Sequence, residues 1–126
     1  MIVRYLTGDP EPMAEASAQV IDSDDSLYIP DVVIAETAYV LQSHYQVPRE
    51  AVIDSLIALL QRDNVSPLHC STEVTIEALL LCRDSGRVAV ADALIWAAAH
   101  CSGRRVVYSL DGRFPDAGIE VRRRTA

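Results

Sequence analysis

Short apolar runs alternate with longer stretches of helical periodicity along this chain. In the longer stretches, apolar residues recur three and four positions apart and define one face of a helix. Capping or first-turn residues mark several of the starts, and Gly86 and Gly103 mark two of the ends. The expected helices run from Glu11 to about Ile21, from Asp31 (as N-cap) through Leu41, from Pro48 to Gln61, from Ser71 or Thr72 to near Gly86, and from Val88 to Cys101, closed by Gly103.

Four short apolar runs between these helices predict strands, at residues 27–29, 64–68, 105–110 and 118–121. The segment from Ile2 to Leu6 could be a further strand, but it runs straight into the turn at Gly8. Helices that alternate with short strands indicate an α/β fold, here a three-layer α/β/α domain with a short parallel sheet. Such a sheet is usually built around a central first strand. None precedes Met1, so we expect that strand to be missing from the N-terminus.

Length, composition and charge limit the classes of protein to which this chain can belong. The 126 residues are enough for a single domain, residues 1–126, with one apolar core. No apolar run is long enough to span a bilayer, and no export signal is recognisable. The net charge is −7 and every basic residue is arginine, which argues against a uniformly basic nucleic-acid-binding surface. Any contact with nucleic acid must come from a local arginine patch or from metal ions held by carboxylates.

The three cysteines, Cys70, Cys82 and Cys101, are an odd number without C-x-x-C spacing. We therefore expect three reduced cysteines that serve as small apolar residues, and neither a disulfide framework nor a zinc site. A reducing cytoplasm follows as the expected location.

Three acidic residues, Glu36, Asp92 and Asp111, stand in apolar or tightly patterned surroundings. A buried carboxylate is costly unless it is paired or binds a metal, and no arginine lies at a suitable helical spacing from Glu36 or Asp92. The alternative is that each is an edge residue with its carboxylate in solvent, Asp111 being a turn former before Gly112. Asp111 follows an expected strand at the sheet edge where α/β proteins bind ligands. Clustered oxygen ligands favour Mg²⁺ or Mn²⁺ over zinc.

Four segments in order resemble successive blocks of the PIN domain, and specifically of VapC-type toxins. They are Ile-Val-Arg-Tyr-Leu-Thr-Gly-Asp-Pro, Ile-Pro-Asp-Val-Val-Ile-Ala-Glu, Ala-Asp-Ala-Leu-Ile and Ser-Leu-Asp-Gly-Arg-Phe. By this resemblance Glu36, Asp92 and Asp111 match the second, third and fourth acids of the family, as catalytic residues and metal ligands. Ser109 matches a hydroxyl residue that supports the last acid.

The resemblance implies a Mg²⁺-dependent (or Mn²⁺-dependent) endoribonuclease that hydrolyses RNA phosphodiester bonds. It also implies a VapB-like antitoxin as partner and a homodimer. Arg4, Arg87 and Arg113 are candidate RNA contacts, against the alternative that they are solvated surface arginines.

The first acid of the family matches nothing in this chain. VapC-type chains usually begin with a strand that ends in Asp-Thr-Asn, whereas this sequence starts just after that point, and Asp9 is the nearest other acid. We expect either a misplaced start codon or a truncated protein. For the 126-residue chain, which lacks the first acid, we expect weak or no nuclease activity. The alternative function is a catalytically impaired PIN-fold protein that binds a partner protein without cleaving RNA.

Overall fold

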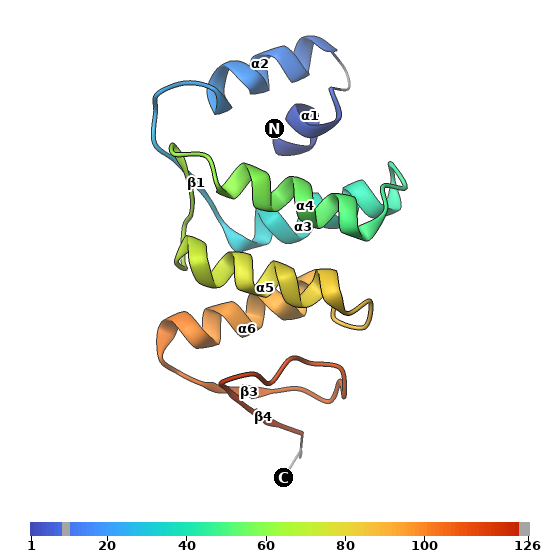
Figure 1. Cartoon of the computed structure of the whole chain (residues 1–126), viewed down its shortest axis with the longest axis vertical. Helices are drawn as coiled ribbons and strands as arrows, with labels where there is room; N and C mark the ends of the chain where they lie inside the picture. The colour runs from blue at the N-terminus through green and yellow to red at the C-terminus, as the bar shows by residue number, and fades with distance from the viewer. Residues whose placement is uncertain (9–10, 124–126) are drawn as a thin grey trace. The chain divides into compact units, whose positions relative to one another are not determined.

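The computed structural model describes residues 1–8 and 11–123, so that Asp9 lies outside the described residues. The chain divides into two compact units, Met1–Leu68 and His69–Ala126, each with its own helices and one pair of parallel strands (Figure 1). No helix in the described part of the chain is both long and apolar enough to cross a membrane.

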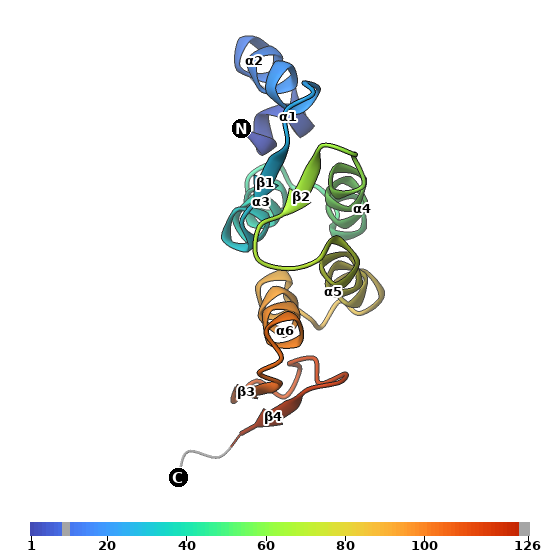
Figure 2. The same cartoon turned by 90° about the vertical axis from the view of Figure 1, so that its left-hand side faces the viewer.

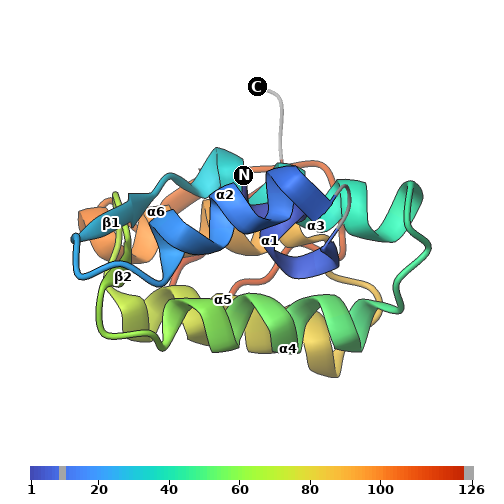
Figure 3. The same ribbon diagram turned by 90° about the horizontal axis from the view of Figure 1, so that it is seen from above.

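The first unit contains four helices and two strands. In chain order they are α1 (Ile2–Thr7), α2 (Glu11–Ile21), β1 (Leu27–Ile29), α3 (Asp31–Ser43), α4 (Arg49–Leu60) and β2 (Val65–Pro67). Strands β1 and β2 are parallel and lie side by side (Figure 2) at the end of the unit where α3 begins (Figure 3). Apolar residues of α3 and α4 form the core, because the helical spacing of residues such as Ile34, Ile53 and Leu56 puts them on inward faces where they are almost fully buried.

The second unit contains α5 (Thr72–Asp84), α6 (Val90–Ser102), β3 (Val106–Tyr108) and β4 (Glu120–Arg122). The Ser71 hydroxyl caps α5 by accepting a hydrogen bond from the N–H of Val74 at 3.2 Å. Gly103 ends α6 in the left-handed conformation, with φ 74°, which L-residues with side chains rarely adopt. Strands β3 and β4 are again parallel. The expected α/β class with short parallel sheets is thus confirmed.

The first segment of the chain, which the sequence left open, is a helix. Ile2–Thr7 ends where Gly8, with φ 71°, closes it and donates its N–H to the carbonyl of Arg4 at 2.9 Å. One prediction at a helix start is wrong. Asp31 is not the N-cap of α3, since Pro30 occupies that position. The Asp31 carboxylate instead accepts a hydrogen bond at 2.8 Å from the N–H of Val32, inside the first turn.

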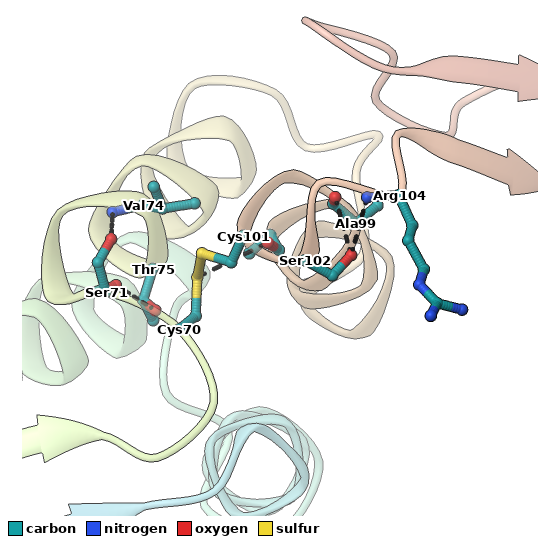
Figure 4. Close-up of a disulfide and its surroundings, with 9 residues drawn as sticks. Cys70, Ser71, Val74, Thr75, Ala99, Cys101, Ser102 and Arg104 are labelled. Carbon is teal, nitrogen blue, oxygen red and sulfur yellow. Dashed lines mark hydrogen bonds between the residues drawn. A yellow bond between two sulfur atoms is a disulfide. The ribbon is translucent and has the colours of Figure 1, made fainter.

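The cysteine prediction is also wrong, because Cys70 and Cys101 form a disulfide bond (Figure 4). Cys70 directly precedes the Ser71 cap of α5, and Cys101 lies in the last turn of α6. The packing of these two helices brings the cysteine Cα atoms to 5.7 Å, which is within the range a disulfide spans. Cys82, outside the disulfide, is fully buried in α5. The cysteine argument for a reducing cytoplasm therefore fails, and that location stays a prediction.

Candidate functional site

Asp111 sits in a short turn just after β3, and its carboxylate is held by its own loop. The Oδ1 atom accepts hydrogen bonds from the backbone N–H of Arg113 at 2.8 Å and from the Nε of the Arg113 guanidinium at 3.2 Å. The backbone N–H, followed by the guanidinium, lowers the pKa of Asp111 below its usual value. Asp111 is therefore a permanent carboxylate near neutral pH, with its side chain 37% exposed.

Ser109, the hydroxyl residue named by the resemblance, forms a hydrogen bond within this turn. Its Oγ accepts a hydrogen bond at 3.1 Å from the backbone N–H of Asp111, two residues later. The serine therefore fixes the backbone from which the carboxylate projects, and it does not touch the carboxylate itself.

Asp92 lies in the first turn of α6, three residues after the N-cap residue Ala89. Ala89 has no side chain that can cap the helix, so the helix start offers unpaired N–H groups and a positive dipole end. A carboxylate is favoured there for electrostatic reasons alone. Asp92 is only partly buried, so its charge remains accessible to a ligand.

The course of the chain carries Asp92 and Asp111 toward the same end of the second unit. After Gly103 the chain reverses, and β3 runs back along α6 (Figure 1). The ten residue-to-residue steps from Asp92 to Ser102 span about 15 Å of helix, and the five steps from Val106 to Asp111 span roughly 16 Å if extended. The two carboxylates thus lie at similar distances from the reversal.

Glu36 belongs to the other unit, on the exposed face of α3. Of the two interpretations that the sequence left open, the one with the carboxylate in solvent describes Glu36. Glu36 is flanked in sequence by Ala35 and the buried Thr37, but α3 turns its side chain outward.

The candidate RNA-contact arginines differ in their surroundings. Arg87 is exposed in the loop that leads into α6, close in sequence to Asp92. Arg113 is 58% exposed and forms the ion pair with Asp111. Arg4 is half-buried in the short helix α1 of the first unit, which makes it the least accessible of the three. The Arg113–Asp111 pair was missed from the sequence, although the two-residue spacing within Asp-Gly-Arg was a possible signal.

The three acids supply carboxylate oxygens, the donor type that Mg²⁺ and Mn²⁺ prefer. In the second unit Asp92 and Asp111 provide two such groups, and only Oδ1 of Asp111 is engaged by Arg113 in the described contacts. Within the described residues, no group of three or more His, Cys, Asp or Glu side chains is arranged to hold a metal ion. Carboxylate oxygens are therefore suitable ligands for such an ion, but the described part of the chain does not group three of them at one place.

Comparison with known proteins gives one match. A family model described as PIN domain matches residues 1–120, and the matched range runs through both units. The comparisons with curated proteins and with solved structures each found no match. PIN domains are generally metal-dependent nucleases, so the match supports a nuclease-type fold and a hydrolase at the level of the family. Because the family model covers nearly the whole chain, this chain belongs to the PIN domain family.

Proposed function

We propose that this protein is a metal-dependent endoribonuclease of the VapC toxin type, formed as one PIN domain over residues 1–126. The observation that carries the proposal is the pair of accessible carboxylates, Asp92 and Asp111, toward one end of the second unit of a PIN-family chain. Glu36 is proposed as the third acid of the site, on the basis of the resemblance in Ile-Pro-Asp-Val-Val-Ile-Ala-Glu.

In this proposal Glu36, Asp92 and Asp111 hold Mg²⁺ or Mn²⁺. The bound ion would supply a water of lowered pKa and would neutralise charge on the phosphoryl oxygens. Asp111 contributes a carboxylate whose pKa is lowered by the backbone N–H of Arg113 and then by its guanidinium. Ser109 acts as a positioning residue through the Asp111 backbone.

Charge distribution supports binding of RNA to the second unit. Residues 1–68 carry three arginines against eleven acids, whereas residues 69–126 carry eight arginines against seven acids. The near-neutral second unit repels a phosphate backbone far less than the acidic first unit does. Arg87 and Arg113, which neighbour Asp92 and Asp111 in sequence, are the proposed phosphate contacts. The VapC-type assignment adds a VapB-like antitoxin and a homodimer as proposed partners.

The test is cleavage of single-stranded RNA, labelled with a fluorophore and a quencher, in Mg²⁺ or Mn²⁺ and with EDTA as control. Because the chain lacks the family's first acid, we expect weak cleavage by the parent. Glu36→Gln, Asp92→Asn and Asp111→Asn should each lower that rate further, and Ser109→Ala should lower it by roughly tenfold. Asp116→Asn, an exposed acid in the same loop region, is the matched control and should cleave as the parent does. Cleavage that persists in EDTA, or that survives Asp92→Asn and Asp111→Asn, would refute the proposal.

A second candidate is a catalytically impaired PIN-fold protein that binds a partner without cutting RNA. The ion pair between Arg113 and Asp111 favours it, because a cation already neutralises one of the acids. Calorimetric titration with Mn²⁺ separates the two candidates. Heat that disappears in Asp111→Asn supports the nuclease, and the absence of any binding heat at millimolar Mn²⁺ supports the partner-binding protein.

A further inference from the structure

The disulfide between Cys70 and Cys101 lies at the surface of the second unit, at one end of the α5–α6 pair (Figure 4). Cys101 is exposed in the last turn of α6, and Cys70 is partly buried directly before the Ser71 cap of α5. Exposed disulfides are the ones that thiols reduce readily, whereas enclosed ones resist reduction. A thiolate from solvent can therefore reach the Sγ atom of Cys101 while the chain stays folded.

The two sulfur atoms differ in a way that favours attack on Cys101. Thiol–disulfide exchange needs one sulfur that the attacking thiolate can reach and a second sulfur that leaves as a thiolate. Attack on Cys101 releases Cys70, which lies at the N-terminal end of α5. The positive end of the helix dipole stabilises a thiolate there, whereas Cys101 lies at the negative end of α6. The more exposed sulfur is thus the one whose attack gives the better leaving group.

The packing of α5 on α6 rests on apolar side chains toward the middle and the far end of the pair. The buried ones are Ala78, Leu79 and Cys82 of α5 and Ala93 and Leu94 of α6. The reduced sulfur of Cys70 also has a partner in this packing, because the carbonyl oxygen of Ala97 lies 3.6 Å from its Sγ atom and can accept a hydrogen bond from a thiol. The helix pair therefore has a core that does not include the bond.

The disulfide joins the last turn of α6 to the residue before the cap of α5. In that last turn, the Ser102 hydroxyl donates to the carbonyl of Ala99 and accepts from the N–H of Arg104, both at 3.2 Å (Figure 4). These two hydrogen bonds stay within α6 and the residues that follow it, so neither connects the two helices. Opening of the disulfide should therefore loosen this end of the pair and leave its core packed.

We propose that the Cys70–Cys101 disulfide is a redox switch, which a dithiol opens and an oxidised dithiol closes in the folded chain. A thiolate of the dithiol attacks the Sγ atom of Cys101, so that a mixed disulfide forms and Cys70 leaves as a thiolate, which takes up a proton. The second thiol of the reductant then displaces Cys101 and completes a disulfide within the reductant. The chain gains two electrons and two protons, the dithiol loses them, and the reverse exchange closes the bond. This inference concerns the second unit alone and stands independently of the proposed nuclease activity.

The first test is the rate at which dithiothreitol reduces the full chain, with and without urea. Samples are quenched with iodoacetamide, and mass spectrometry identifies the alkylated cysteines. We expect Cys70 and Cys101 to be alkylated together in the folded chain, at a rate within about tenfold of the rate in urea. Cys82 is the internal control, because it is fully buried and should stay unmodified until urea is added.

A disulfide that opens only when the chain unfolds gives the opposite result. Reduction would then be at least about a thousandfold slower without urea, and Cys82 would be alkylated together with the other two cysteines. Any slowing beyond about tenfold in the folded chain, or modification of Cys82 in the absence of urea, would overturn the proposal.

Two measurements on the reduced chain test whether the change is local. Trp96, the single tryptophan, is almost fully buried in α6, so its fluorescence should keep the emission of a buried indole after reduction and should shift only in urea. Hydrogen exchange of the Cys101 and Ser102 amides should become at least about tenfold faster, whereas the Leu94 amide should remain far slower than either. Oxidised dithiothreitol should restore the original rates. An exposed indole after reduction, or unchanged exchange at Cys101 and Ser102, would contradict the switch.

The double variant Cys70→Ser, Cys101→Ser separates the effect of the bond from that of the reductant. Without reductant it should have the exchange rates of the reduced parent, and dithiothreitol should leave these rates unchanged. Cys82→Ala, which keeps the disulfide, should open and close as the parent does. If the double variant kept the slow exchange of the oxidised parent at Ser102, the bond would not restrain the last turn of α6 and the proposal would fail.

Discussion

The disulfide between Cys70 and Cys101 allows a quantitative prediction about stability. The bond joins residues 31 positions apart in the chain, so it restricts a loop of that length in the unfolded state. In the chain-entropy model a loop of this length corresponds to about 3.7 kcal/mol at room temperature. Measured effects usually fall below this value, and we expect reduction to lower the free energy of unfolding by about 2–4 kcal/mol.

Urea unfolding followed by circular dichroism, with and without a phosphine reductant, measures the effect. For an m-value of about 2 kcal/mol/M, the unfolding midpoint should fall by roughly 1–2 M. The double variant Cys70→Ser, Cys101→Ser should unfold at the lower midpoint and should not respond to the reductant. Cys82→Ala, which leaves the disulfide in place, should respond as the parent does.

A thiol count tests the premise directly. Of the three cysteines, only Cys82 should react with Ellman's reagent when the unreduced chain is denatured. Three reactive thiols without reductant, or an unchanged midpoint after complete reduction, would refute the reasoning.

Three further substitutions test individual hydrogen bonds of the structure. Arg113→Ala should raise the pKa of Asp111 toward its ordinary value, because the guanidinium is lost while the backbone N–H remains; an unchanged midpoint in an NMR titration of the carboxyl carbon would contradict this. A lowered pKa stabilises the fold above the unfolded-state value, and this stability is lost as the pH falls through the folded-state pKa. The variant should therefore lose less stability on acidification than the parent, and the loss should be complete at a higher pH. Trp96→Phe should cost about 1–3 kcal/mol in urea unfolding, because the buried indole N–H donates to the carbonyl of Ala117 at 2.7 Å and its removal leaves that acceptor without its partner. Asn64→Ala should cost a similar amount, since one side-chain amide donates to three backbone carbonyls at 2.9, 3.0 and 3.3 Å; stability equal to that of the parent would show that water replaces it.

Helix positions were predictable because their signals are local. The periodic face of α4 and the glycine after α6 can be read from neighbouring residues, and the structure has both within about two residues of the prediction. The start of the chain was ambiguous for the same reason. Ile2 and Val3 favour a strand by their branching, whereas the left-handed Gly8 closes a helix, and no local rule decides between them.

Features that depend on residues distant in sequence were not predictable. Nothing in the spacing of Cys70 and Cys101 indicates a bond, because the bond arises only when α5 packs on α6. The exposure of Glu36 illustrates a different limit. An acid between apolar neighbours in the sequence suggests a buried side chain. On a helix with one apolar face, however, neighbours in sequence point in different directions, so such an acid can face solvent.

The candidate acids differ in how strongly their local surroundings point to chemistry. Asp92 would be favoured at the start of α6 in any protein, because the dipole and the uncapped N–H groups stabilise a carboxylate there. Asp111 has a neutralising arginine two residues away, so its presence also has an ordinary structural explanation. Glu36 is exposed on α3 and, among the described residues, forms no hydrogen bond or ion pair that would explain a carboxylate at that position. A loss of Mn²⁺ binding in Glu36→Gln would therefore be the most discriminating evidence for the nuclease, since no structural role in the described contacts would account for it.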